Sequence, residues 1–426
     1  MVNIPLIKAP ISSGEFYRSY LIPNQPCVLD QWITSGWEAR ELWCHLDGTV
    51  NIQAVFKHIP DDQVLCVSDC SRLEFDAHVT MEMTVKEFTH YWDDLQPPLD
   101  TKLLYLKDWH YFRDNPGHYF TLPDLFASDW LNEFWRVRRD ITNDYQFVYL
   151  GKNNTWTPLH SDVYRSYSWS ANICGRKRWW FFPPGEEKKL SSMGAIPPDV
   201  RELELEHIGV DYCIIDQYPG QAVFVPSGWY HQVVNLTECL SINHNWFNAA
   251  NVHHVWDHLQ EQLRLVEEST KDVQDIPGWH QECQICLRAL AGIDFFEFFL
   301  ILKYILLTRW PSIVSSDEVR CEEVPGLQDL AKCDKLKSID ELVNAALLHC
   351  FEQTADDAVQ ILRQAESCTT LNMPPSDHNP GALSRWIRLH DFVNAIRIIR
   401  EIIRHPVTAH VSMLPADPLR AFLFNL

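Results

Sequence analysis

Residues 156–184 read WTPLHSDVYRSYSWSANICGRKRWWFFPP. His160 and Asp162 stand two positions apart in this stretch, soon after a Thr-Pro pair. On a β-strand, residues i and i+2 share a face, so an imidazole and a carboxylate at this spacing can reach one point. The next segment, 166–173, alternates polar and apolar residues, which is typical of a strand with one polar face. The stretch therefore predicts β-structure that carries two candidate metal ligands.

The same β-pattern extends from Tyr145 to about Phe247. Short apolar or alternating segments recur there between Gly, Pro and Asn turns, and this spacing predicts an antiparallel sandwich or barrel. If the polar face of 166–173 points inward, the barrel has a wet interior. The segments are YQFVYL, RSYSWSANIC, KRWWFF, YCIID, QAVFVP and CLSINHNWF.

A third ligand is expected from a neighbouring strand. His231 is the best candidate, because the turn Pro226-Ser227-Gly228 delivers it at the start of a strand. A His-x-Asp pair alone is a weak signal in a chain with 19 histidines, but a second histidine motif within the β-region strengthens it. Two imidazoles and one carboxylate on one face of an octahedral metal are typical of non-haem Fe(II) oxygenases, in which the opposite face is open to substrate and dioxygen.

A basic residue begins the strand KRWWFF. A lysine that enters an aromatic strand is costly to bury unless it meets an anion. Lys177 would meet one if a dicarboxylate such as 2-oxoglutarate bound the metal through its keto-acid end and the lysine through its far carboxylate. The alternative is a lysine that reaches back to the surface. Arg176 and Arg178 flank it, so the pattern leaves open which cation points inward.

The regions on either side of the β-region have different patterns. Residues 1–140 mix short helices and strands, residues 141–250 hold the β-core, and residues 251–426 have helical spacing. The most apolar run, 293–307, contains Glu297 and Lys303, and is expected to be a buried helix rather than a membrane span. Other expected elements are a helix over 83–95 with Thr84 as its N-cap, a strand at 103–109, a helix with a stripe at Val255, Leu259, Leu263 and Val266, and a long helix from Trp386 to Ile403.

Composition limits the partners and the compartment. The formal net charge of −21 would repel phosphate backbones, so we expect no nucleic-acid partner, and a basic protein partner fits better. The 13 cysteines are thinly spread, and the N-terminus lacks the design of a secretory signal. Both features favour a reducing, cytoplasmic location with free thiols.

Two further features have more than one interpretation. The pair Cys283 and Cys286 lacks a second pair for a zinc site and is expected to lie within an apolar helix. Tyr164 and Tyr167 either line a substrate entrance or are buried against the barrel.

Four motifs occur in order: TPLHSD, GRKRWWFFPPGE, VPSGWYHQVVN and SINHNW. Together they resemble the JmjC-domain oxygenases, whose fold is a cupin-type double-stranded β-helix. The implied fold class is α+β, with a jelly-roll core, an N-terminal α/β lead-in and a C-terminal helical region. The segment WSANICGRKRW and the helical C-terminal region are most similar to the jumonji-domain-containing protein 4 group of lysyl hydroxylases.

The resemblance implies a role for each matching residue. His160, Asp162 and His231 would bind Fe(II), and Lys177 would bind the far carboxylate of the co-substrate 2-oxoglutarate. Further contacts to 2-oxoglutarate are implied for Thr157, Tyr105 and Asn243. Ser170 stands where many members of the family have asparagine, which puts that contact in doubt.

The implied reaction uses dioxygen and 2-oxoglutarate to hydroxylate a protein side chain, and the group resemblance implies a lysine of the translation-termination release factor. Two other functions remain open: demethylation of N-methyl-lysine in histones, and a cupin-like binding scaffold without catalysis. The chain lacks a zinc-finger reader motif and a basic tract, which disfavours the histone demethylase. The C-terminal helices either pair two chains, as in several small JmjC hydroxylases, or brace the barrel.

Overall fold

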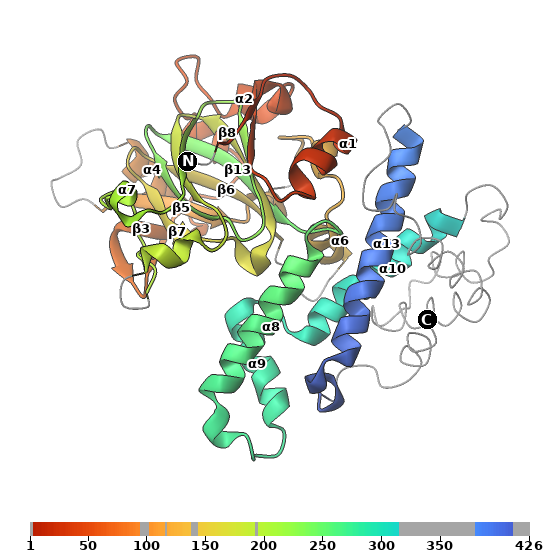
Figure 1. The fold of residues 1–426 in the computed structure, drawn as a ribbon. Helices are drawn as coiled ribbons and strands as arrows, with labels where there is room; N and C mark the ends of the chain where they lie inside the picture. The colour runs from red at the N-terminus through yellow and green to blue at the C-terminus, as the bar shows by residue number, and fades with distance from the viewer. Residues whose placement is uncertain are drawn as a thin grey trace. The chain divides into compact units, whose positions relative to one another are not determined.

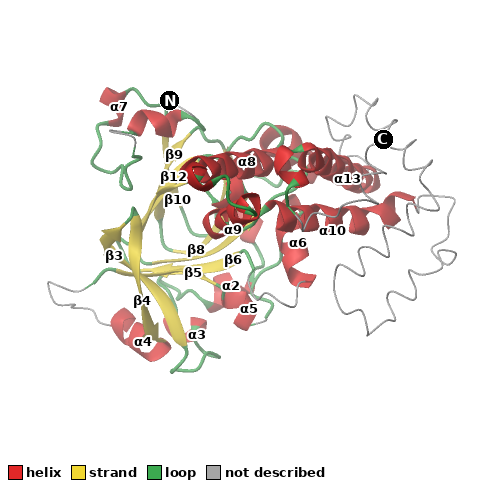
Figure 2. Cartoon of the chain, turned by 90° about the horizontal axis from the view of Figure 1, so that it is seen from below, coloured by secondary structure: helices red, strands yellow, loops and turns green. Residues whose placement is uncertain are grey.

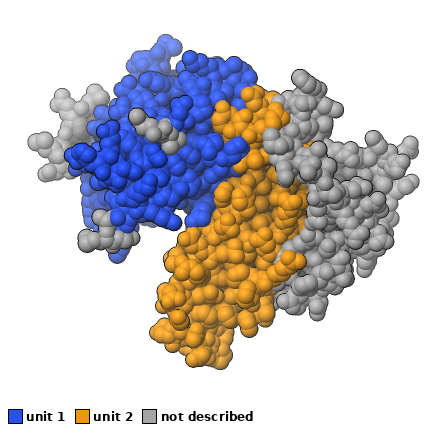
Figure 3. Space-filling model, in the orientation of Figure 1, with its two compact units in different colours: residues 1–11, 23–127, 142–246 blue, residues 12–22, 128–141, 247–426 orange. Residues whose placement is uncertain are grey.

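The computed structural model describes residues 3–93, 102–115, 117–137, 144–191, 195–314 and 380–411. They fall into two units, coloured separately in Figure 3. Unit 1 holds residues 1–11, 23–127 and 142–246, and unit 2 holds residues 12–22, 128–141 and 247–426. The described strands all lie in unit 1, whereas the described elements of unit 2 are helical, as the colours of Figure 2 show. The predicted α+β class, with a β-core and a helical C-terminal region, is confirmed.

Eight antiparallel strands form the jelly roll at the centre of unit 1 (Figure 1). Four of them lie side by side in the order β11-β8-β13-β6 within a nine-stranded sheet, and the other four form a second sheet in the order β10-β9-β12-β7. The eight strands are β6 (Gln146–Gly151), β7 (Trp156–His160), β8 (Tyr167–Cys174), β9 (Lys177–Phe182), β10 (Cys213–Gln217), β11 (Ala222–Val225), β12 (Tyr230–Asn235) and β13 (Cys239–Trp246). Each segment predicted from the pattern is a strand.

The larger sheet is extended at both edges by N-terminal strands. One edge gains β2 (Cys27–Leu29) and β1 (Leu6–Ile7), and the other gains β5 (Leu104–Trp109), β3 (Val64–Glu74) and β4 (Ala77–Thr84). The β3–β4 hairpin turns through Phe75 and Asp76, and both residues have positive φ. A two-residue turn needs positive φ at both positions if its twist is to match that of the strands. Strand β5 confirms the prediction for 103–109, whereas the β3–β4 hairpin was not predicted.

Short helices accompany the N-terminal strands. Helix α4 confirms the prediction for 83–95 in its described part: Thr84 accepts a hydrogen bond from the Glu87 backbone N–H, and the Glu87 carboxylate accepts one from the Thr84 N–H. The helices of unit 1 are α2 (Glu38–Leu42), α3 (Ile52–Val55), α4 (Val85–Asp93), α5 (Tyr111–Asp114) and α7 (Leu205–Ile208).

Strand β8 is buried on both faces, and the two faces differ in polarity. Ser168, Ser170 and Asn172 point into the jelly roll, opposite Asn245, Asn243 and Ser241 of β13 in the register. The expected wet interior is therefore present beside β8. It is not continuous, because an apolar cluster that includes Trp179, Phe181, Val223 and Val225 fills the part between β9 and β11.

Aromatic residues from the N-terminal region cover the outer face of β8. The Trp169 ring stacks on Phe126, with ring centroids 5.5 Å apart, and also contacts Trp37 and Phe120. Cys174, the last residue of β8, is joined to Cys44 by a disulfide. The prediction that all cysteines are free thiols is therefore wrong for this pair. The two cysteines are 130 residues apart in sequence, and only the packing of the N-terminal segment brings them together. The sequence alone therefore did not indicate the disulfide.

Unit 2 contains helices from three separate parts of the chain. Helix α8 buries the predicted stripe of Val255, Leu259, Leu263 and Val266, and α10 and α13 confirm the buried and the long apolar helices. Among the described residues, each helix is too short or too polar to cross a bilayer. The bounds are α1 (Ser13–Phe16) with a π-helical turn (Tyr17–Leu21), α6 (Trp130–Val137), α8 (Val252–Ser269), α9 (Trp279–Ala291), α10 (Phe295–Val314) and α13 (Pro380–Arg404).

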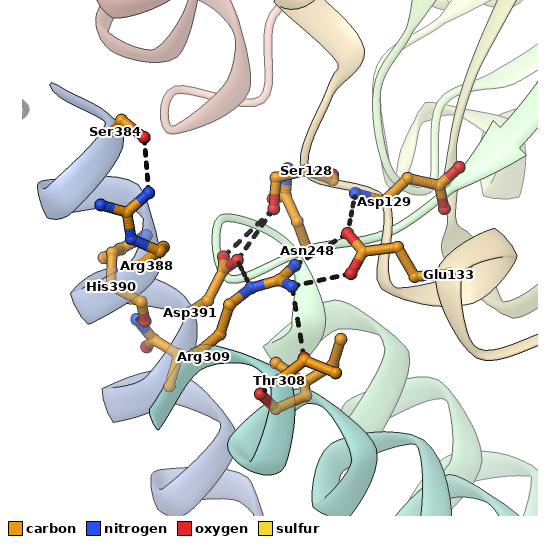
Figure 4. A network of polar contacts seen from close by, with 12 residues as sticks. Ser128, Asp129, Glu133, Asn248, Thr308, Arg309, Ser384, Arg388, His390 and Asp391 are labelled. Atoms are coloured by element: carbon orange, nitrogen blue, oxygen red, sulfur yellow. Dashed lines mark hydrogen bonds and ion pairs between the residues drawn. The ribbon is translucent and has the colours of Figure 1, made fainter. Parts of the chain in front are cut away.

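A buried ion network joins three of these helices (Figure 4). Arg309 on α10 donates to both carboxylate oxygens of Glu133 on α6, at 2.7 and 2.8 Å, and to Asp391 on α13, at 2.9 Å. Ser128 also donates to Asp391. The Asp391 side chain is fully buried, so its charge depends on Arg309 for compensation.

We expect Arg309→Ala to lower the free energy of unfolding of unit 2 by about 3–5 kcal/mol, because it leaves two carboxylates without their shared cation in a buried site. Urea unfolding followed by helical circular dichroism measures the change. The matched control is Arg72→Ala, which removes a pair with Glu74 whose side chains are 58% and 61% exposed, and it should cost less than about 1 kcal/mol. Equal effects of the two substitutions would contradict the importance of the network.

Candidate metal centre and co-substrate pocket

Three predicted ligands converge in unit 1. His160 at the end of β7 and His231 near the start of β12 are direct neighbours in the antiparallel register, and their ring centroids are 4.3 Å apart. His160, Asp162 and His231 each offer one ligand atom, and these three atoms all lie within 4.8 Å of one another. They form a group that can hold a metal ion in the part of the chain that the structure describes.

Both imidazoles are oriented for metal binding. His160 Nδ1 lies 2.7 Å from the Pro158 carbonyl oxygen, and His231 Nδ1 lies 3.1 Å from the Trp229 carbonyl oxygen. A carbonyl only accepts hydrogen bonds, so each Nδ1 carries the proton and each Nε2 keeps its lone pair for a metal. Burial lowers the pKa of His231 to about 4, which favours the neutral, metal-binding form.

The carboxylate is placed by a turn rather than by a strand. Strand β7 ends at His160, and Asp162 begins a short helical turn, although its backbone remains extended at φ −60° and ψ 151°. The extended conformation keeps the i and i+2 relation that the sequence predicted. Ser168 on β8 donates to Asp162 Oδ2 at 2.6 Å, which fixes one oxygen and leaves the other for a metal.

A clamp on the turn before β12 sets the position of His231. The Asn24 side chain accepts a hydrogen bond from the Ser227 N–H and donates one to the Ser227 carbonyl, both at 2.9 Å. The Asn24 carbonyl also accepts a hydrogen bond from the Trp229 indole. The sequence showed no sign of this contact, because Asn24 is about two hundred residues away along the chain.

Lys177 is the cation that points inward. Its side chain is buried, whereas Arg176 is exposed and Arg178 pairs on the outside with Asp216. Gly175 makes the tight turn into β9: its φ is +79°, and a Cβ there would lie 1.9 Å from the Glu238 carbonyl oxygen. The local chain path therefore requires glycine and fixes the direction of the residues that follow.

The charge of Lys177 lacks a carboxylate partner among the described residues. Its Nζ donates to Ser241 Oγ at 2.7 Å and lies 6.0 Å from the centroid of the Tyr149 ring. Burial lowers the pKa of Lys177 to about 8, so the ammonium is still mostly charged at neutral pH. A buried cation without an anion is a binding site for one.

The remaining predicted residues line the same pocket as the metal ligands and Lys177. The Tyr105 ring packs against Gly151, where a Cβ would lie only 2.5 Å from the ring, so glycine leaves the space that the ring needs. Thr157 Oγ1 accepts a hydrogen bond from the Val233 N–H, and Asn243 donates to Ser241 Oγ at 3.1 Å. The pocket is lined in addition by residues that include Tyr149, Ser168, Ser170, Trp179 and Asn245.

Three pocket residues carry polar groups suited to an anionic ligand. Burial raises the pKa of Tyr105 and of Tyr149 well above the usual tyrosine value, so both remain neutral phenols. The Ser170 hydroxyl is buried and has no hydrogen-bond partner among the described residues. These groups fit a dicarboxylate beside the metal, and the histidine and aspartate donors fit Fe(II). Tyr149 and Ser168 were not predicted, although alternation along β6 and β8 could have shown which faces they share.

Within the described part of the chain, the cysteine pair on α9 is not in a group of residues that could hold a metal ion. Cys283 is buried with its sulfur 3.7 Å from Thr270 Oγ1, and Cys286 is exposed on the same helix. The expectation that both cysteines lie on one helix is confirmed.

Known proteins share both the β-core and much of the flanking chain. Residues 147–246 match the family described as "JmjC domain, hydroxylase". The mouse 2-oxoglutarate and iron-dependent oxygenase JMJD4 is 40% identical over 72% of this chain and 76% of its own length. The human protein of that name is 38% identical over 81% of this chain and 85% of its own. Arginine-specific demethylase JMJ20 of Arabidopsis thaliana is 38% identical over 69% of this chain and 68% of its own. With these matches and this ligand geometry, the chain belongs to the JmjC-domain hydroxylase family.

Proposed function

We propose that this 2-oxoglutarate- and Fe(II)-dependent oxygenase hydroxylates a protein side chain, specifically a lysine of the translation-termination release factor. The observation that carries the oxygenase assignment is the convergence of His160, Asp162 and His231 beside the buried, unpaired cation of Lys177. The first group suits Fe(II), and the second suits the far carboxylate of 2-oxoglutarate.

Some residues of the site would bind the metal, and others position the ligand atoms. His160, Asp162 and His231 would hold Fe(II) on one face, while Ser168 and the backbone carbonyls keep the donor atoms in place. When bound, Fe(II) couples oxidation of 2-oxoglutarate by dioxygen to oxygen insertion into a C–H bond. One dioxygen then gives succinate, carbon dioxide and a hydroxylated side chain. The protein contributes a fixed set of ligands and a pocket that limits access of water.

The pocket would hold 2-oxoglutarate mainly through charge. Lys177 would pair with its far carboxylate, and the neutral hydroxyls of Tyr105 and Thr157 would add hydrogen bonds. Asn243, which shares Ser241 with Lys177, would donate an amide hydrogen. Ser170 is shorter than the asparagine that many members of the family carry at its position, and its buried hydroxyl lacks a partner among the described residues, so it can take a contact of its own.

The choice of substrate rests on the resemblance to the jumonji-domain-containing protein 4 group, and the JMJD4 proteins are among the similar relatives. The net charge of −21 is compatible with a basic partner. We place the activity in the cytoplasm, where translation terminates. Seven of the nine described cysteines are free thiols, as expected there, and the Cys44–Cys174 disulfide is the exception.

A second candidate is demethylation of an N-methylated basic side chain. The relative named arginine-specific demethylase supports this alternative. The chemistry is shared, because hydroxylation of an N-methyl carbon gives an unstable product that releases formaldehyde. A scaffold without catalysis is disfavoured by the intact ligand set and pocket.

We expect the purified protein, with Fe(II), 2-oxoglutarate and air, to add the mass of one oxygen atom to a lysine of the unmethylated release factor. Mass spectrometry of the release factor and measurement of succinate report the two products. Asp162→Ala should abolish both, because it removes a metal ligand, and Asp211→Ala serves as an exposed control. Formaldehyde release from methylated peptides alone would favour the demethylase, and the absence of any 2-oxoglutarate turnover would favour the scaffold.

The affinity for 2-oxoglutarate should depend on pH through Lys177. As pH rises through about 8, the ammonium loses the proton that its pairing with the carboxylate requires. We therefore expect the Kd for 2-oxoglutarate to rise about tenfold per pH unit above this value. Calorimetry without dioxygen measures it.

Lys177→Met should bind 2-oxoglutarate about a hundredfold more weakly and lose this pH dependence. Arg178→Met is the matched control, because this neighbouring cation points outward with its side chain 42% exposed, and it should keep the wild-type profile. A Lys177→Met protein with the same pH dependence as wild type would show that another group binds the carboxylate.

A further inference from the structure

A row of three aromatic side chains runs along one face of β6 and its preceding residue. Tyr145, Phe147 and Tyr149 alternate with Val148 and Leu150 of the opposite face, which are fully buried in the core. Successive ring centroids in this row are 6.5 Å apart. The three rings are only half-buried, so part of each is open to a ligand. We call Tyr145, Phe147 and Tyr149 the aromatic row.

The aromatic row is continuous with the metal centre. Tyr149 lines the pocket, and Phe147 lies opposite the pocket residue Asn243 in the register between β6 and β13. At the other end, the Tyr145 hydroxyl is hydrogen-bonded to the hydroxyl of Tyr164, two residues after the ligand Asp162. Of the two tyrosines considered for the entrance, Tyr164 is buried and contacts the end of this row through its hydroxyl, whereas Tyr167 is buried outside the barrel against Phe224 and Trp246.

A carboxylate stands beside this row. Strand β5 has an irregular register between Leu106 and Trp109, and Asp108 within that irregularity has a φ of +55°. The Tyr149 hydroxyl donates a hydrogen bond to Asp108 Oδ1. The Asp108 side chain is nevertheless 52% exposed. The carboxylate is thus tied to a pocket residue while it remains open to an incoming group.

Such a surface fits a side chain with an aliphatic stem and a cationic end. The stem can lie against aromatic rings, and the cation gains both from the faces of the rings and from the carboxylate. A neutral amide would gain only ordinary hydrogen bonds, and an acidic side chain would be repelled.

We propose that Asp108, together with the aromatic row, recognises the cationic end of a basic side chain, lysine or arginine, as it enters the metal centre. This inference rests on the proposed function and names the residue that selects the substrate class. Asp108 acts as a specificity-determining residue at the mouth of the pocket.

Lys107 already occupies part of the proposed site. Its Nζ lies 2.8 Å from Asp108 Oδ2, and its side chain is 23% exposed. A carboxylate can accept about four hydrogen bonds, so a second cation can share it, but the two cations would compete. The chain's own lysine therefore shows that the carboxylate accepts an ammonium group, and its removal should favour the substrate.

The test measures KM and kcat with the intact release factor as substrate. Asp108→Asn removes the charge but keeps a residue type that tolerates positive φ. We expect it to raise KM for the release factor about ten- to a hundredfold, with a much smaller change in kcat and an unchanged Kd for 2-oxoglutarate. Lys107→Met should lower KM, which a purely structural role of Asp108 would not produce.

The matched control is Asp76→Asn, because Asp76 is also an exposed aspartate with positive φ but lies in the β3–β4 turn. It should leave KM unchanged. An unchanged KM in Asp108→Asn, or a raised KM in Lys107→Met, would overturn the inference while the proposed function stands. Absence of hydroxylated release factor with the wild-type protein would contradict the proposed function and remove this inference with it.

Discussion

The register between β7 and β12 is the constraint on which the metal centre depends. It places His160 directly opposite His231, so that two imidazoles from distant parts of the chain meet. Because side chains alternate along a strand, a slip of one residue would turn one imidazole away from the other. The backbone then also fixes the ring orientation, since each Nδ1 donates to the carbonyl two residues earlier.

The pocket combines this metal site with an uncompensated charge. Lys177 is buried at a cost in solvation, and in the described residues its partners are a hydroxyl and an aromatic ring rather than a carboxylate. A structure built only for stability would pair or remove such a cation. Placed beside three metal ligands, it instead provides the attraction for a co-substrate, and the polar faces of β8 and β13 surround it.

Local sequence patterns predicted the metal ligands better than the contacts that hold those ligands in position. The strands of the jelly roll and the three ligands follow from alternation, turn residues and spacing. The pattern left open which of the three cations at 176–178 points inward, and the family resemblance singled out Lys177. Asn24 and the Cys44–Cys174 disulfide could not be predicted, because they join segments that only the folded N-terminal region brings together. Asp108 was hidden for another reason: it lies at an irregularity in β5, where the regular two-residue period of a strand no longer indicates direction.

The central claim is that one ion is shared by three side chains inside the jelly roll. A crystal structure of the protein grown with Mn(II) in place of Fe(II), with anomalous scattering to locate the metal, tests it most directly. We expect a single ion bound by Nε2 of His160, Nε2 of His231 and one oxygen of Asp162, in the pocket that also holds Lys177. An anomalous peak elsewhere, or a pocket that stays empty at saturating Mn(II), would contradict it.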